Sequence, residues 1–267
     1  MPVVTGDVEL DVVATRRLSP SLVRVELRGA VPSAGVPDEA CVLQFPDADG
    51  EPTAERGRWY TVRRIDGAGL TVDIVLHPGG VGGEWAAVAR VGDRLRRTHG
   101  NSWFRRPEGA AWQVLAGDVT ALPAIGRIVE ESAGLRTIVH VEVPDPADAQ
   151  ELPGAEVVWH HTPGLARASR LGEIVAGIAL PEGSGYVYVA GEASATRSVR
   201  THLRARGLPR GSYGVVGYWR AEIEKWNARL EASGVDTAAI YERALAAGRD
   251  EEEVRALYEA GLAAAGL

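Results

Sequence analysis

Four arginines surround a Trp-Tyr pair in the stretch RGRWYTVRRID, which begins at Arg56. If the stretch is a β-strand, alternation places Arg58 and Tyr60 on one face and Thr61 and Arg63 on the other. A guanidinium two residues from an aromatic ring can bind a phosphate while the ring lies against a flat heterocycle. A barrel strand with solvated arginines is the alternative, and this stretch by itself does not decide between them.

A second stretch, LHPGGVGGEWAAVARVGDRL, carries four glycines before a predicted helix at about residues 84–90. The glycines are Gly79, Gly80, Gly82 and Gly83. Their backbone N–H groups, together with the positive end of a helix, could bind a diphosphate. A Gly-rich hairpin loop without a ligand is the alternative, and the GxGxxG fingerprint is absent here. His77, at the end of the preceding strand, is either a ligand contact or a turn residue.

The segment Gly117-Asp118-Val119-Thr120 connects a predicted buried strand to a helix that carries Pro123 near its first turn. Such a strand-to-helix turn is typical of ligand binding in α/β sheets. Thr120 is also a candidate for the N-cap, a structural role that requires no ligand.

Two later strands also end in residues that could contact a ligand. Glu192 follows a buried strand at its carboxyl end, which is the edge where open α/β sheets bind ligands. The last strand ends in Tyr218, Trp219 and Arg220, where the aromatic pair could cover a ring or close the core.

Composition restricts the class of protein. The 267 residues are enough for one large or two modest domains, and 45% hydrophobic with 24% charged residues is typical of a globular protein. The net charge of −7 disfavours nucleic acid and anionic membranes as partners. Because no signal peptide and no long apolar run is visible, we expect a cytoplasmic protein without stable membrane insertion.

Cysteine and histidine usage argues against a metal site. The single cysteine, Cys41, cannot form a disulfide within the chain, an iron–sulfur cluster or a Cys-rich zinc site. His99, His160 and His161 lack the spacing of convergent ligands, so we assign no metal.

Hydrophobic periodicity predicts a small antiparallel β-barrel followed by a doubly wound parallel sheet. Alternation of period two in residues 23–28 and 70–76, with short Gly/Pro/Asp turns, predicts the barrel. Near-continuous Val/Ile/Ala runs that alternate with helical segments, at 122–132 and 194–206, predict the parallel sheet. The expected domains are residues 1–108 for the barrel, 109–222 for the α/β domain and 223–267 for a helical extension.

The helical extension is expected from its helix-forming composition. Asp250 and Glu253 have the spacing of a capping box at the start of one of its helices. A structural brace, packed on the body or on a second copy, is its simplest role.

The order of these motifs resembles that of the siderophore-interacting protein family, which are flavin-dependent ferric-siderophore reductases of the ferredoxin–NADP reductase-like superfamily. The resemblance covers about residues 10–220. The matching segments are Arg58–Arg63, His77 with Trp85, Gly117–Ile125, Gly191-Glu192 and Gly217–Arg220. The first is shared across the superfamily, whereas GDxTALPAI followed by a late GYWR is much more specific to this family.

The resemblance implies that the barrel holds FAD. It implies that Tyr60 lies against the isoalloxazine, that Arg58 pairs with the diphosphate and that Thr61 lies near flavin N5. Since alternation places Thr61 opposite Tyr60, its contact requires a bent strand or a backbone group. The residues expected at FAD are Arg58, Trp59, Tyr60, Thr61, His77, Gly82, Gly83 and Thr120.

The resemblance also implies NADH or NADPH as co-substrate on the α/β domain. The expected nucleotide contacts are Asp118, Thr120, Ala121 and Glu192. The choice between the two nucleotides stays open, although Arg167 and Arg170 could suit a 2′-phosphate or serve only the surface. Arg63 and Arg220 are expected to contribute to a siderophore pocket.

The implied activity is hydride transfer from NAD(P)H to FAD and then one-electron reduction of Fe(III) in a ferric siderophore, with release of Fe(II). No catalytic side chain is certain, because hydride transfer at flavin N5 requires no general base. The family's lysine near residue 43 is missing, which favours a less anionic chelate such as a hydroxamate. The alternatives are a general NAD(P)H:flavin or electron-transfer oxidoreductase and a non-catalytic flavin- or siderophore-binding module. The siderophore and the oligomeric state stay open.

Overall fold

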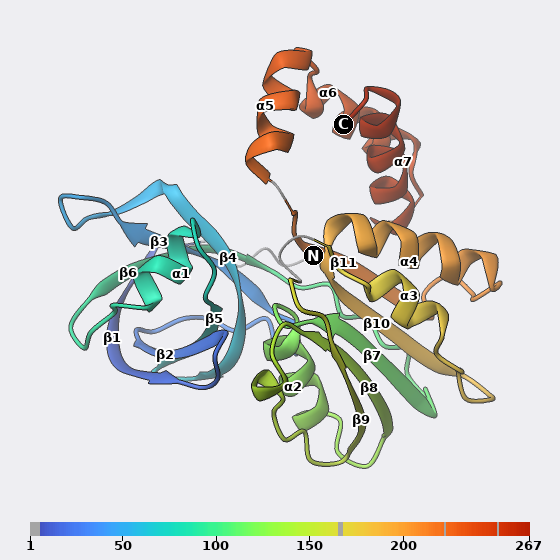
Figure 1. The fold of residues 1–267 in the computed structure, drawn as a ribbon, viewed down its shortest axis with the longest axis horizontal. Helices are drawn as coiled ribbons and strands as arrows, with labels where there is room; N and C mark the ends of the chain where they lie inside the picture. The colour runs from blue at the N-terminus through green and yellow to red at the C-terminus, as the bar shows by residue number, and fades with distance from the viewer. Residues whose placement is uncertain (1–5, 165–167, 222, 250) are drawn as a thin grey trace. The chain divides into compact units, whose positions relative to one another are not determined.

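The computed structural model describes residues 6–164, 168–221, 223–249 and 251–267. The chain forms two compact units, one ending at Trp219 and the other beginning at Arg220. The first unit contains a closed six-stranded antiparallel barrel and a five-stranded parallel sheet with helices, and the second unit is helical (Figure 1). The predicted fold class is therefore confirmed.

The barrel has the strand order β1-β2-β5-β4-β3-β6 and closes where β6 pairs with β1. Its strands are β1 (Val8–Arg17), β2 (Leu22–Arg28), β3 (Ala40–Pro46), β4 (Pro52–Asp66), β5 (Gly69–Val75) and β6 (Arg94–Asn101). Alternate apolar side chains fill the interior, and they surround the buried thiol of Cys41. Burial raises the pKa of this thiol to about 12. Helix α1 (Val81–Ala86) lies between β5 and β6, earlier and shorter than the predicted helix at 84–90.

Strand β4 contains the whole RGRWYTVRRID stretch and is the longest strand of the barrel. Its pairing with β5 shifts register between Val62 and Arg64. A register shift of this kind bends a strand and changes the direction of the neighbouring side chains. The bend lies directly after Thr61, for which simple alternation had predicted the face opposite Tyr60.

The sheet has the order β11-β10-β7-β8-β9 with all neighbours parallel. Its strands are β7 (Trp112–Asp118), β8 (Arg136–Val143), β9 (Ala155–His161), β10 (Gly185–Glu192) and β11 (Tyr213–Trp219). Between them lie α2 (Leu122–Glu130), the 3-10 turn η1 (Pro146–Asp148), α3 (Leu171–Ala176) and α4 (Ala193–Ala205). Every residue of β7 and β10 is buried, as the near-continuous apolar runs predicted.

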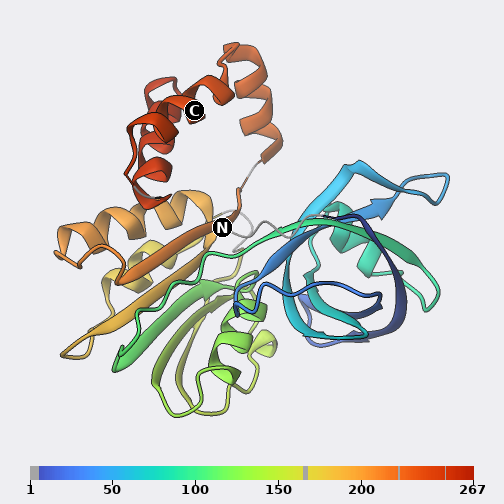
Figure 2. The ribbon, with the colours of Figure 1, turned by 180° about the vertical axis from the view of Figure 1, so that it is seen from behind.

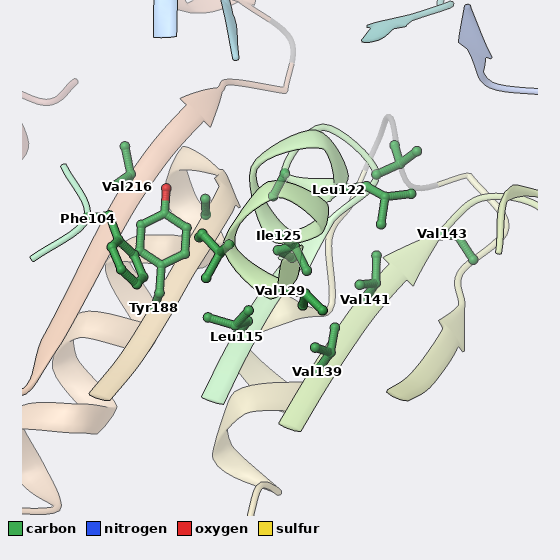
Figure 3. Packing of buried hydrophobic residues seen from close by; sticks show 14 of the residues in the cluster. Phe104, Leu115, Leu122, Ile125, Val129, Val139, Val141, Val143, Tyr188 and Val216 are labelled. Atoms are coloured by element: carbon green, nitrogen blue, oxygen red, sulfur yellow. The ribbon is translucent and has the colours of Figure 1, made fainter. Parts of the chain in front are cut away.

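Helices cover both faces of the sheet, α2 on one and α3 with α4 on the other (Figure 1; seen from behind in Figure 2). On the first face, Ile125 and Val129 of α2 pack against Leu115 of β7 and Val139 and Val141 of β8 (Figure 3). These contacts fix the helix that follows the Asp118 turn against the middle of the sheet.

Polar contacts join the barrel to the sheet within the first unit. The Arg127 guanidinium of α2 donates to the Val62 carbonyl of β4 at 2.9 Å. The buried Asp148 carboxylate of η1 accepts from the Ser19 hydroxyl at 2.5 Å and from the Ser21 N–H and hydroxyl at 2.8 and 2.7 Å. Ser19 and Ser21 lie in the turn between β1 and β2, so this carboxylate ties one end of the barrel to the sheet.

The second unit contains α5 (Ile223–Ser233), α6 (Thr237–Ala247) and α7 (Glu251–Ala264), and the helical extension is thus present. Asp236 caps α6 by accepting the Ala239 N–H at 2.9 Å. Of the predicted capping box, Asp250 lies outside the described residues, and Glu253 accepts the Arg249 N–H at 2.9 Å. In the part of the chain that the structure describes, no helix is both long and apolar enough to cross a bilayer.

Replacing Asp148 by alanine is expected to lower the free energy of unfolding by about 2–4 kcal/mol, because the buried Ser19 hydroxyl and two half-buried Ser21 donors lose their acceptor. Urea denaturation followed by tryptophan fluorescence measures the loss. Asp145→Ala is the matched control, since Asp145 is exposed in the same turn and accepts the Ala147 N–H at 2.8 Å. Equal losses in the two variants would contradict the proposed tie between barrel and sheet.

Candidate functional site on the barrel and the sheet edge

Tyr60 of β4 and the glycines of α1 are in direct contact. A Cβ added at Gly82 would lie 1.8 Å from Tyr60 Oη and 2.9 Å from Phe45 Cζ, so only glycine fits against the phenol. The Phe45 ring meets Tyr60 edge-on at a centroid distance of 5.7 Å and holds it from the barrel side. The two stretches that the sequence singled out separately therefore form one surface.

The turn from β5 into α1 is equally tight around His77. A Cβ at Gly80 would lie 2.2 Å from His77 Cε1. A Cβ at Gly83 would lie 3.0 Å from the Val75 carbonyl oxygen and 3.1 Å from the backbone nitrogen of His77. The His77 ring is exposed. Within this turn, the Glu84 carboxylate accepts the Gly79 N–H at 3.1 Å and the His77 carbonyl accepts the Gly80 N–H at 3.4 Å, and Gly82 and Gly83 are buried. We call residues 77–83 the glycine turn.

Arg58 is exposed on β4, two residues before Tyr60. Its guanidinium donates to the carbonyl oxygens of Glu55 at 3.1 Å and Gly57 at 2.7 Å. Among the described residues, no carboxylate lies within ion-pairing distance of Arg58, which leaves this cation available for an anionic ligand. Burial raises the pKa of Tyr60, an effect that the nearby Arg58 charge opposes, so the ring remains a neutral phenol.

Trp59 is placed differently from its two neighbours. Its ring is 46% exposed and meets the edges of His99 at 5.1 Å and Trp103 at 6.0 Å between centroids. Strand alternation directs this cluster to the face opposite Arg58 and Tyr60. The structure therefore groups Tyr60, His77 and Gly82 and separates Trp59 from them.

The carboxyl edge of the sheet is organised by the Asp118 carboxylate, which is fully buried. One oxygen accepts the Thr120 N–H at 2.9 Å and the Thr120 hydroxyl at 2.5 Å, and the other accepts the Glu192 N–H at 2.9 Å and the Trp219 indole N–H at 2.8 Å. Burial raises the pKa of Asp118, and these donors act in the opposite direction. Asp118 thus ties together the ends of β7, β10 and β11.

The strand order places this tie at a topological switch point. The chain runs from β7 to β8 and β9 on one side of β7 and then crosses over to β10 and β11 on the other. In open α/β sheets, ligands bind outside the carboxyl ends of the strands at such a reversal. Asp118 ends β7 and Glu192 ends β10. Thr120 is half-exposed at this edge, whereas the N-cap of α2 is the buried Ala121. The N-cap role considered for Thr120 is therefore wrong, because its hydroxyl is taken by Asp118.

Glu192 is the N-cap of α4. Its carboxylate accepts the Ser194 and Ala195 N–H groups at 2.7 and 2.9 Å, and also the Ser194 hydroxyl. A carboxylate at this position accepts hydrogen bonds from N–H groups that have no partner within the helix, and it interacts favourably with the positive end of the helix dipole. The sequence signal was present, since an acidic residue stood directly before the predicted helix at 194–206, but it was interpreted only as a nucleotide contact.

The arginines expected at further ligand groups have other partners. Arg63 of β4 forms a bidentate pair with Glu130 of α2 at 2.8 and 2.5 Å. Arg170 pairs with Glu173 at 3.1 Å, and Arg167 lies outside the described residues. Arg220 belongs to the second unit, where its guanidinium lies 4.6 Å from the centre of the Trp226 ring.

Sequence reasoning missed a buried polar cluster between the barrel and the sheet. It consists of Asp38 before β3, Tyr188 of β10 and Tyr218 of β11, with the Tyr188 hydroxyl 3.1 Å from Asp38 Oδ2 and 3.0 Å from the Tyr218 hydroxyl oxygen. Tyr188 packs its ring beside Phe104 (Figure 3). No local spacing could have indicated the cluster, because Asp38 and Tyr188 are 150 residues apart in the chain.

Two family models match most of the chain. The model described as siderophore-interacting FAD-binding domain matches residues 11–100, and the model described as siderophore-interacting protein matches residues 110–222. The first covers the barrel strands that hold Arg58 and Tyr60, and the second covers the sheet edge around Asp118.

Three proteins illustrate the similarity. The crystal structure of a siderophore utilization protein from T. fusca is 36% identical, covers 82% of this chain and 94% of its own, and has a TM-score of 0.74. The ferric vibriobactin reductase ViuB of Vibrio cholerae is 27% identical over 79% of this chain and 88% of its own. The NADPH-dependent ferric-chelate reductase of Escherichia coli is 24% identical over 67% of this chain and 71% of its own.

Gly82→Ala is expected to lower the free energy of unfolding by about 1–3 kcal/mol, because the new methyl group overlaps Tyr60 and Phe45. Displacement of the phenol should also change the near-ultraviolet circular dichroism of the tyrosines. Gly67→Ala is the control, since a Cβ there would meet no atom within 4 Å. If Gly82→Ala matched Gly67→Ala in both measurements, the packing of the glycine turn on Tyr60 would be refuted.

Proposed function

The chain belongs to the siderophore-interacting protein family, whose cofactor is FAD, and we propose that it reduces ferric siderophores with electrons from NADH or NADPH and releases Fe(II). Its relatives support the coarser assignment, a flavin-dependent ferric-chelate reductase. In the proposal FAD binds to residues 1–108 and the nucleotide to residues 109–222. The reaction would take place in the cytoplasm, where NADH and NADPH are regenerated.

The observation that carries the proposal is the contact of Tyr60 with Gly82. It packs the glycine turn against a neutral aromatic ring that stands two residues from Arg58, a cation with no carboxylate partner among the described residues. These are the groups that a flavin dinucleotide requires, because its isoalloxazine is flat and its diphosphate is anionic. The residues present therefore fit FAD.

In the proposed complex Tyr60 lies against the isoalloxazine, Arg58 pairs with the diphosphate, and His77 and the Gly82-Gly83 backbone line the phosphate side. FAD accepts two electrons from a nicotinamide and delivers them singly, which is the exchange that Fe(III) requires. The chain's own contribution is to position these partners and to exclude water between them.

The nucleotide would bind at the switch point, with the half-exposed Thr120 at the nicotinamide end and the buried Ala121 behind it. Asp118 would act by holding Thr120 and Trp219 in place, because its two oxygens already accept four hydrogen bonds from the protein. Glu192 would likewise fix the start of α4 beside the nucleotide path.

For the chelate, we propose a ferric siderophore of low negative charge, such as a trihydroxamate. The half-buried Gln44 of β3 stands in the segment where many family members carry a lysine. Arg63 is paired with Glu130. This ion pair reduces the positive charge that the Arg63 guanidinium could offer to an anionic catecholate.

Anaerobic mixing of the FAD-loaded protein with NADH or NADPH should bleach the visible flavin absorbance, and a ferric trihydroxamate should restore it with formation of Fe(II) that a chromogenic chelator traps. Persistence of the flavin band with both nucleotides would indicate a binding module. Oxidation by ferricyanide without oxidation by the ferric chelate would indicate a general electron carrier.

Arg58→Ala should raise the dissociation constant for FAD about 10- to 100-fold, because a charge-assisted phosphate contact is worth about 1.5–3 kcal/mol. Quenching of FAD fluorescence on titration of the apoprotein measures it. Arg64→Ala is matched in charge, exposure and strand, and should bind FAD like the unaltered protein. If both variants bound FAD equally weakly, the loss would come from the change in net charge and not from a specific contact of Arg58.

A further inference from the structure

Strand β4 of the barrel carries a β-bulge at the point where it meets α2. Val62 and Arg64 pair with consecutive residues of β5, so Arg63 between them is an extra residue in this pairing. A bulge changes the direction in which the side chain of the extra residue points. The Arg63 guanidinium reaches the side of α2, where the Glu130 carboxylate accepts two hydrogen bonds from it at 2.8 and 2.5 Å.

Two contacts from one side of α2 hold this bulge. Arg127 and Glu130 are three residues apart, so their side chains leave the same side of the helix. The buried Arg127 donates to the Val62 carbonyl at 2.9 Å, and Glu130 binds the neighbouring Arg63. Gly126 leaves room for the second contact, since a Cβ there would lie 3.3 Å from Nε and from one terminal nitrogen of Arg63. We call Arg63, Arg127 and Glu130 the α2 clamp.

The helix that carries the clamp is itself fixed to the sheet. Residues 122–129 of α2 are all buried, and Ile125 and Val129 pack against β7 and β8. The turn before α2 is fixed as well, because the Asp118 carboxylate accepts both the N–H and the hydroxyl of Thr120. With nine residues, α2 is about 13 Å long. It is therefore a spacer of constant length between the Thr120 turn and the bulge of β4.

We propose that Arg63 is a positioning residue for hydride transfer, which acts by holding the cofactor strand at a set distance from the nucleotide turn through the α2 clamp. The inference rests on the proposed function, in which FAD binds at Tyr60 and Thr61 and the nicotinamide at Thr120. Hydride transfer requires its two reacting atoms to lie about 3–3.5 Å apart, and a displacement of about 1 Å costs about 100-fold in rate. The clamp holds β4 directly after Thr61, so it acts beside the reacting groups. This role differs from the siderophore contact expected for Arg63.

Arg63→Met removes the charged contact and keeps an unbranched side chain. Stopped-flow reduction of the FAD-loaded variant by a saturating concentration of NADH or NADPH should be about tenfold slower than in the unaltered protein. The dissociation constants for FAD and for the nucleotide should not change, because each ligand binds to one domain. Arg136→Met is the matched control. It removes an ion pair of Arg136 with Glu156 at 3.2 Å that lies within the sheet, and it should leave the reduction rate unchanged.

Glu130→Ala breaks the same ion pair from the helix side and should slow flavin reduction to the same extent. The double variant Arg63→Met/Glu130→Ala should be no slower than either single variant, because both changes remove one contact. An unchanged rate in Arg63→Met, an equal loss in Arg136→Met, or additive losses in the two clamp variants would overturn the inference alone. If neither nucleotide reduced the FAD-loaded unaltered protein, the proposed function would fail and the inference with it.

Discussion

One hydrogen bond, from the Arg127 guanidinium of α2 to the Val62 carbonyl of β4, fixes the barrel to the sheet where the site depends on it. Val62 follows Thr61 directly, and α2 begins at the turn that Asp118 organises. The same helix therefore sets the position of β4 next to Thr61 and of the sheet edge at Asp118. Arg127 is itself buried and held by Glu131 at 2.7 Å, which limits its freedom to leave the carbonyl.

The two buried carboxylates of the site illustrate different uses of the same group. Asp118 accepts four hydrogen bonds from groups at the ends of three strands. These bonds offset the cost of burying the carboxylate and hold the three strand ends in fixed positions. Asp38 has fewer donors, and burial raises its pKa. Its carboxylate accepts the Tyr188 hydroxyl at 3.1 Å and so connects the segment before β3 to β10 of the sheet.

The elements of the site were predictable from sequence where the signal was local. Apolar periodicity located the strands, and the Gly-Asp-x-Thr segment was correctly placed between a buried strand and a helix. The contact of Tyr60 with Gly82 was not predicted, because it depends on how the barrel strands pair. The pairing of Asp38 with Tyr188 had no local signal at all. Helix α1 begins at Val81, before the predicted start at residue 84. Glycine has a low helix propensity, but packing against Phe45 and Tyr60 allows Gly82 and Gly83 to be helical.

The placement of Cys41 has a consequence for a protein that handles iron and reduced flavin. Such chemistry generates peroxide, which oxidises thiolates but reacts slowly with protonated thiols. Enclosed by barrel side chains and with its pKa raised to about 12, this sulfur remains in the unreactive form. Because the only cysteine in the sequence is buried, side reactions meet no exposed thiol, and oxidative damage would fall on other groups first.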